Sequence, residues 1–150
     1  MRSLPHKILI ALSGCGALLI WMGCDGGTST HRDLWEKKKS ENYRYEFRWD
    51  CYCAFNQEWV EIFVQGDDIV RVENLETGAP HVEGIGEAKN SYVTIDSLFN
   101  LIDATESGAA DDVAATYDAY NGFPVDVIID YDANSIDDEI GFAIGKVTFE

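Results

Sequence analysis

The chain has 150 residues, of which 46% are hydrophobic and 12% aromatic, and its 27 acidic side chains outnumber 11 basic ones to give a net charge of -16. This content of core-forming side chains excludes an acidic disordered tail, and the length fits one globular domain. The negative charge would be repelled by nucleic acids and by anionic lipid surfaces, so it argues against a binder of either.

The first 23 residues have the pattern of a secretory signal peptide. Basic side chains precede an apolar run from Ile8 to Met22, which is short for a membrane-spanning helix. The run ends at Gly23-Cys24, which resembles the lipobox of bacterial lipoproteins, where a small residue precedes a cysteine that becomes lipidated and N-terminal. We therefore expect residues 1–23 to be removed, Cys24 to carry the lipid, and residues 24–33 to form a flexible tether.

Two alternatives for this leader stay open. The residues that end at Cys15 match the lipobox pattern more closely, but cleavage there would leave an apolar stretch in the mature chain. An uncleaved membrane anchor is the other alternative, because the apolar run lies near the length that a bilayer requires. With Cys24 as the anchor, the protein is exported and held on a bacterial membrane, facing the periplasm or the cell exterior.

The first part of the mature chain predicts one helix and three strands. Arg32 to Asn42 reads as a short helix. Tyr43 to Cys51 alternates aromatic and charged side chains with a strict period of two, which predicts a strand with an aromatic face toward the core. Glu58 to Gln65 predicts a second strand, and Ile69 to Val72 returns as a third after a hairpin turn.

The second part begins with a long segment from Glu76 to Tyr92, a length that is usually functional or mobile in compact domains. Thr94 is then placed to cap a helix over residues 95–107. Its apolar residues recur at helical spacing, so one face should pack on the sheet. These residues are Ile95, Leu98, Phe99 and Ile102.

Three more strands are predicted towards the C-terminus, over Val113–Tyr117, Val125–Asp130 and Ile140–Phe149. Gly141 and Gly145 in the last strand indicate a bulge or a close backbone approach. Together the elements predict an α+β domain over residues 34–150. It would hold an antiparallel sheet of about five to six strands, an N-terminal helix and one central amphipathic helix packed on the sheet.

Cys51-Tyr52-Cys53 is the first feature that could carry chemistry. Export places both cysteines in an oxidising compartment, and lipidation of Cys24 leaves them as the two cysteines of the domain. Cα atoms two residues apart on a regular strand lie about 6.8 Å from one another, so a disulfide requires a bulge or turn at Tyr52. We favour a structural disulfide. The alternatives are a copper site, for which two thiols are an incomplete ligand set, and a thiol redox protein acting through Cys51 and Cys53.

Residues 130–139 form the second such feature. Asp130, Asp132 and Asn134 match three alternating ligand positions of a calcium loop, and Asp138 supplies a further carboxylate. The glycine and the bidentate glutamate of such a loop are absent, and the flanks are predicted strands. A polar hairpin connection is therefore favoured, since Asp and Asn promote turns. Calcium stays as the alternative, and it is the only cofactor that these ligands suit.

Signatures of an enzyme are few. The mature chain keeps His31 in the tether region and His81 in the long loop, where a histidine is usually a solvated side chain. Neither lies in a recognisable nucleophile motif. Gly84-Ile85-Gly86 lacks the preceding strand and following helix of a phosphate cradle. We therefore expect no catalytic residue and no enzymatic activity.

The order of several short motifs resembles that of a family of small secreted bacterial lipoproteins classified as a domain of unknown function. The motifs are the lipobox-like leader, the tyrosine-rich strand running into Cys51-x-Cys53, Thr94 to Phe99, Tyr117-Asp118, Gly122-Phe123-Pro124, Ile129-Asp130 and Asp137-Asp138-Glu139. The resemblance covers about residues 34–149. It implies an exported, membrane-tethered α+β domain with no assigned activity and no established catalytic residue.

The charge distribution suggests the role of such a domain. Residues 90–150 contain 13 acidic side chains and a single basic one, Lys146. We therefore expect a non-catalytic binding or scaffold module of the cell envelope. It would be held at the membrane by the lipid on Cys24 and would present its acidic C-terminal half to a basic protein partner.

Overall fold

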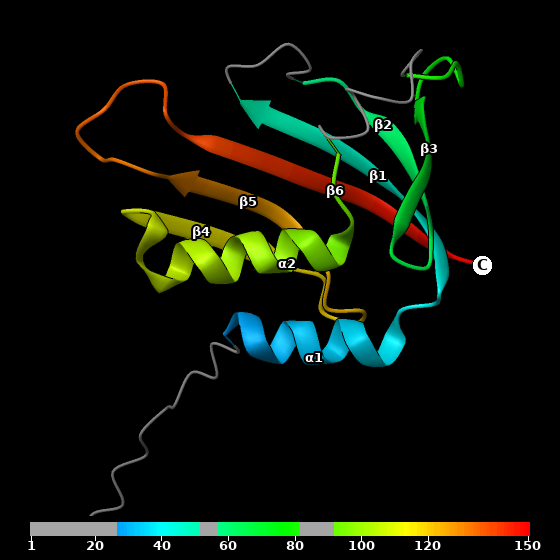
Figure 1. Ribbon diagram of the computed structural model, residues 1–150, viewed down its shortest axis with the longest axis horizontal. Helices are drawn as coiled ribbons and strands as arrows, with labels where there is room; N and C mark the ends of the chain where they lie inside the picture. The colour runs from blue at the N-terminus through cyan, green and yellow to red at the C-terminus, as the bar shows by residue number, and fades with distance from the viewer. Residues whose placement is uncertain (1–26, 52–56, 82–91) are drawn as a thin grey trace, which may run out of the picture.

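A six-stranded antiparallel sheet with the strand order β3-β2-β1-β6-β5-β4 forms the centre of the fold, and two helices lie against one of its faces (Figure 1). The structure is a computed structural model that describes residues 27–51, 57–81 and 92–150. The helices are α1 (Thr28–Lys38) and α2 (Ile95–Ala104). The strands are β1 (Asn42–Cys51), β2 (Val60–Gln65), β3 (Asp68–Asn74), β4 (Asp112–Tyr117), β5 (Pro124–Asp130) and β6 (Ile140–Phe149).

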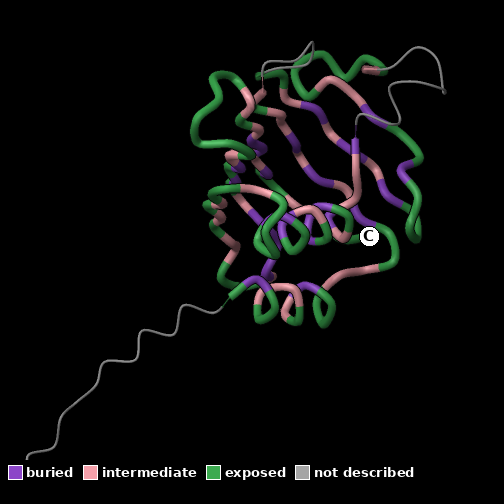
Figure 2. The backbone as a smooth tube through the Cα atoms, turned by 60° about the vertical axis from the view of Figure 1, so that its left-hand side comes forward, coloured by how far each residue is buried: buried purple, intermediate pink, exposed green. Residues whose placement is uncertain are grey.

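The predicted α+β class and antiparallel sheet are confirmed, and each strand begins and ends within two residues of its predicted bounds. The period of two in β1 explains this agreement. Tyr43, Tyr45 and Phe47 are buried under the helices, whereas the charged residues between them lie on the other face. Figure 2 shows a similar alternation along β1 and β2, between buried positions in purple and intermediate positions in pink.

Helix α2 packs its apolar face on the sheet as predicted. Thr94 caps its first turn by accepting a hydrogen bond from the backbone N–H of Ser97 at 3.3 Å. The helix is shorter than the predicted 95–107, because it ends at Ala104 and continues as a π-helical turn over Thr105–Ala109. The turn closes at Gly108, whose φ of 107° lies in the left-handed region.

Helix α1 differs from its predicted bounds. It covers Thr28–Lys38 instead of residues 32–42, so it begins inside the segment expected to be a tether, 24–33. The reason lies in tertiary contacts, since Thr28 is only 5% exposed and Trp35 is fully buried. Figure 1 shows α1 alongside α2, with the two helices running in opposite directions.

Trp35 connects α1 to two strands of the sheet, β1 and β6, and to the turn between β4 and β5. Its ring lies edge-on to Tyr43 at 5.3 Å and to Phe123 at 6.4 Å, and it packs at 5.9 Å from Phe149. Edge-to-face aromatic pairs each contribute roughly 0.5–1.5 kcal/mol beyond the area that they bury. The N-terminal helix is therefore part of the core.

The two glycines predicted to mark a bulge or close approach in β6 do so. The register between β1 and β6 shifts between Tyr45 and Phe47, which face β6 around Gly145. A Cβ atom at Gly145 would lie 2.5 Å from a carboxylate oxygen of Glu46, and one at Gly141 would lie 3.1 Å from the Val127 carbonyl oxygen. Both positions have a neighbour where a side chain would otherwise lie.

Neither α1 nor α2, the helices of the described residues, combines the length and the hydropathy that a membrane-crossing helix needs.

Gly122 lets the turn between β4 and β5 pack directly on α1. Its φ is +85°, and a Cβ atom there would lie 2.3 Å from the His31 carbonyl oxygen and 2.9 Å from the Trp35 nitrogen. We expect Gly122→Ala to lower the free energy of unfolding by about 2 kcal/mol or more, because it adds a clash with helix backbone to the strain of a positive φ. Urea denaturation followed by tryptophan fluorescence measures this loss.

Gly108→Ala is the matched control. Gly108 also has a positive φ, but a Cβ atom there would meet nothing within 4 Å. The control should therefore lose only the backbone strain, about 1–2 kcal/mol. Equal losses for the two variants would show that the contact between Gly122 and α1 does not matter for stability.

Candidate functional site

Carboxylates from three segments meet at one end of the sheet. The β4 residue Asp112 is in register with Asp130, the last residue of β5, and residues 131–139 connect β5 to β6. In Figure 1 this connection is the orange loop at the left. We call this region the acidic end, and its members are Asp111, Asp112, Asp130, Asp132, Asp137, Asp138 and Glu139.

Asp132 and Asn134, two of the predicted calcium ligands, instead build the loop itself. The Asp132 carboxylate accepts hydrogen bonds from the backbone N–H of Asn134 at 3.0 Å and from its side-chain amide at 3.2 Å. These bonds to the ionised form lower the pKa of Asp132. Asp132 and Asn134 thus form a turn, as expected for a polar hairpin connection.

Asp130 and Asp138, the other two predicted ligands, do lie near one another. The pKa of Asp130 is raised. Desolvation is the largest cause, and repulsion from Asp138, Glu139 and Asp111 adds to it. One carboxylate oxygen of Asp130 and one of Asp138 are shielded from solvent without a hydrogen-bond partner. The acidic end therefore holds more negative charge than its own contacts neutralise.

The described residues contain no group of three or more His, Cys, Asp or Glu side chains placed to hold a metal ion. A calcium ion would have to draw Asp130, Asp132, Asn134 and Asp138 together on binding. The calcium alternative therefore stays a prediction.

The predicted cysteine sites fall partly outside the described residues. Cys51 ends β1, where it is in register with Ile140 next to the acidic end, and it is disulfide-bonded. Cys53, its predicted partner, and Cys24, the predicted lipidation site, lie outside the described residues. The Cys51–Cys53 pairing and the lipidation therefore stay predictions.

Both histidines of the predicted mature chain are engaged with neighbouring side chains. The His31 ring stacks on Tyr117 with 4.2 Å between ring centroids. The His81 side chain is only 7% exposed, and its Nδ1 lies 3.6 Å from a carboxylate oxygen of Glu58. His81 is thus more buried than the solvated loop side chain that was expected.

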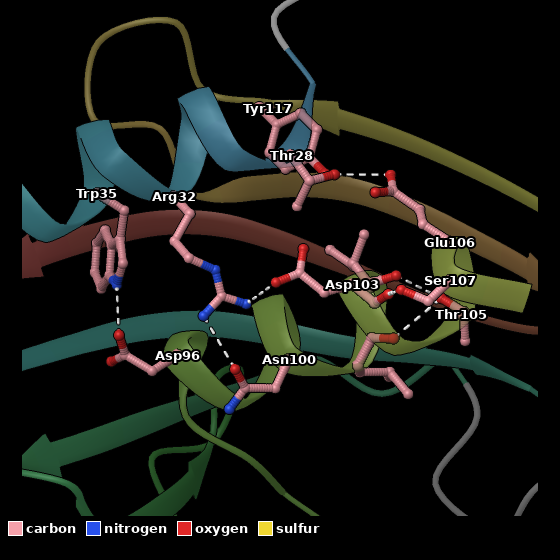
Figure 3. Close-up of polar contacts among 12 residues, drawn as sticks. Thr28, Arg32, Trp35, Asp96, Asn100, Asp103, Thr105, Glu106, Ser107 and Tyr117 are labelled. Atoms are coloured by element: carbon pink, nitrogen blue, oxygen red, sulfur yellow. Dashed lines mark hydrogen bonds and ion pairs between the residues drawn. The ribbon is translucent and has the colours of Figure 1, made fainter. Parts of the chain in front are cut away.

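A polar interface between α1 and α2 was not predicted from the sequence. Figure 3 shows the Arg32 guanidinium donating to Asn100 at 3.0 Å and to Asp103 at 2.7 Å. Thr28 donates to Glu106 at 2.7 Å and lies 2.8 Å from the Tyr117 hydroxyl. These contacts join residues 68 to 89 positions apart in sequence, so no local pattern could indicate them.

The same interface continues toward the C-terminal end of α1. Trp35 Nε1 donates to Asp96 at 3.3 Å, and Lys39 donates to the same carboxylate at 2.7 Å. Burial alone would lower the pKa of Lys39, but hydrogen bonds to Asp96 and Glu36 outweigh it and raise the pKa. Asp96, predicted only to favour the helix dipole, therefore also joins the two helices.

Away from the acidic end, a cleft of about 380 Å³ is lined by residues that include Trp59, Asn74 and Leu75. Its polar groups are largely occupied by one another. Asn74 donates to Glu58 at 2.6 Å, and its side-chain oxygen accepts from Thr77. The cleft contains none of the predicted site residues.

A model for a family of unknown function, DUF6174, matches residues 28–149 of the chain. Searches of curated proteins and of solved structures found no significant match. The match begins at the first residue of α1 and ends at the last residue of β6.

The raised pKa of Asp130 predicts how stability depends on pH. Because folding makes this carboxyl harder to ionise, the folded state loses stability as the pH rises from below the ordinary pKa of the group through its raised value. Asp130→Asn removes the charge, so we expect its melting temperature to exceed that of the wild type at pH 7. The difference should vanish at about pH 3, where the carboxyl is protonated in both states. Circular dichroism during heating measures this.

Asp126→Asn is the matched control, because Asp126 is an exposed residue of the same strand. It should change the melting temperature little at either pH. A stabilisation by Asp126→Asn as large as that by Asp130→Asn would contradict the prediction. Calcium chloride that stabilises the wild type more than sodium chloride of equal ionic strength would instead favour the calcium alternative.

Proposed function

The chain belongs to the DUF6174 family of unknown function, and we propose that it is a lipid-anchored bacterial lipoprotein. Its domain binds a basic protein partner in the cell envelope and catalyses no reaction. The lipid would be carried by Cys24, and the binding surface would be the acidic end. The Cys51–Cys53 disulfide would close β1 beside that surface.

The uncompensated charge of the acidic end is the observation that supports this proposal. Ion pairs of the described residues join basic side chains to Asp96, Asp103 and other acids outside this region, and none involves a carboxylate of the acidic end. Desolvation is the largest cause of the raised pKa of Asp130, and repulsion from neighbouring carboxylates adds to it. A lysine or arginine from a partner would relieve that repulsion. Complementary charge of this kind mainly accelerates association and selects the partner.

The position of α1 supports a domain held close to the membrane. Only residues 25–27 separate Cys24 from the first residue of the helix. Three extended residues span about 10 Å. A lipid on Cys24 would therefore keep α1 near the bilayer surface, within reach of partners that are themselves at the membrane.

Binding of a basic partner is tested with the full-length protein in a neutral detergent and a fluorescein-labelled octalysine peptide. Fluorescence anisotropy should show binding that weakens steeply between about 50 and 500 mM salt, because salt screens exposed charges. The triple variant Asp130→Asn, Asp138→Asn and Glu139→Gln should weaken binding about tenfold at low salt.

The matched control removes three charges elsewhere, with Asp67→Asn, Asp68→Asn and Glu76→Gln around the β2–β3 hairpin and the turn after β3. It should change octalysine binding little. Equal weakening by the two triple variants would mean that binding follows total charge and would contradict a site at the acidic end.

The lipid anchor is tested by Cys24→Ser in a bacterial host. We expect the variant to lose the acyl mass and to move from the membrane fraction to the soluble fraction, since the lipid supplies the membrane affinity. Cys15→Ser is the matched control and should leave both properties unchanged. Lipidation that is lost in Cys15→Ser and kept in Cys24→Ser would assign the anchor to the other cysteine.

A further inference from the structure

The two edges of the sheet differ in how they are protected. At the β3 edge the chain folds back on itself, since Asn74 donates to the Ala79 carbonyl at 2.9 Å and His81 donates to the Val72 carbonyl at 3.0 Å. Glu73 forms an isolated bridge with Pro80, which has no N–H to offer. The segment after β3 therefore covers part of its outer side.

The β4 edge is open in the part of the chain that the structure describes, where β4 pairs only with β5. Its central residues, from Val113 to Thr116, include no proline and no charged side chain. Such a strand presents unpaired backbone groups to another chain, and sheets usually block them with lysine, proline or a covering segment. Among residues 27–51, 57–81 and 92–150, none of these devices protects Val113 to Thr116.

The register defines what an added strand would meet on the face of the sheet away from the helices. Asp112 lies beside Asp130, Ala114 beside Ile128, and Thr116 beside Asp126. Ile128 is 53% exposed. The small side chain of Ala114 leaves the flank of Ile128 accessible from the edge. Along β4, this face therefore offers a negative, an apolar and a negative position in turn.

We propose that β4 accepts an extended segment of a basic partner with the pattern basic–x–apolar–x–basic, which adds to the sheet as a seventh strand. Its two basic side chains would face Asp112 with Asp130 at one end and Asp126 across Thr116 at the other. Its apolar side chain would lie over Ala114 against Ile128. The pattern reads the same in both chain directions, so the segment could pair with β4 in a parallel or an antiparallel orientation.

Charge complementarity selects this partner over a second copy of the chain. The net charge of -16 opposes self-association. Pairing of two β4 strands would also bring Asp111 and Asp112 of each copy to a shared edge without adding a basic side chain. A partner segment that supplies lysine or arginine removes this cost.

The proposal rests on the proposed function, and it is tested with the full-length protein and a labelled peptide containing Lys-Thr-Leu-Thr-Lys. We expect a Kd about tenfold lower than that of a peptide of the same composition in which the two lysines are adjacent. Two further peptides carry backbone N-methyl groups, one on the Lys and Leu residues and the other on the Thr residues. Alternate N–H groups of a strand point to opposite sides, so only one of these peptides should lose binding.

Ala114→Lys places a positive charge on β4 between the positions that the two lysines of the peptide would occupy. The variant should therefore weaken binding of the patterned peptide about tenfold or more. Val70→Lys is the matched control, because Val70 is 52% exposed on the opposite edge strand. It should leave the Kd unchanged.

The outcomes separate the two proposals. Octalysine binding together with full affinity of both N-methylated peptides would overturn pairing along β4 and leave the proposed function standing. Failure of octalysine and of the patterned peptide would overturn both. A dimer in sedimentation experiments that Ala114→Lys dissociates would assign the edge to a second copy and overturn the basic partner.

Discussion

The burial of two tyrosine hydroxyls at the centre of the sheet fixes the rest of the architecture. Tyr43 and Tyr45 point their rings from β1 into the core, and a phenol buried without a partner is costly. The Tyr45 hydroxyl donates to the Val93 carbonyl, and the Tyr43 hydroxyl accepts from the Ile95 N–H at 3.3 Å. Burial raises the pKa of both phenols, so they stay neutral. These contacts place the start of α2 on the sheet, and α1 then packs against α2.

Local patterns predicted the elements whose stability is local or periodic. The alternation in β1 and the cap at Thr94 are complete within about ten residues, and the observed bounds follow them. The start of α1 could not be predicted in this way, because Gly27 provides no side-chain cap and Thr28 finds its partners in Glu106 and Tyr117. The π-helical end of α2 was also missed, since Thr105 turns its hydroxyl back onto the carbonyls of Leu101 and Ile102.

At the acidic end too, local features could be predicted from the sequence and long-range contacts could not. The run of acids in residues 130–139 was visible in the sequence, and so was the tendency of Asp132 to form a turn. The environment of Asp130 was not, because it depends on Asp111, which precedes β4, and on Asp138 across the loop. The openness of the β4 edge also depends on the strand order, which sequence periodicity does not determine.

The pairing of β1 with β6 has a consequence for how the chain folds. The first and last strands lie side by side in the middle of the sheet, so β6 joins the β3-β2-β1 half to the β5-β4 half. Before residues 140–149 are in place, the two halves have no shared strand, and their contact requires closure of a loop of nearly a hundred residues. Such separation slows folding and makes assembly of the sheet depend on the final strand, which also leaves the domain intolerant of truncation at its C-terminus.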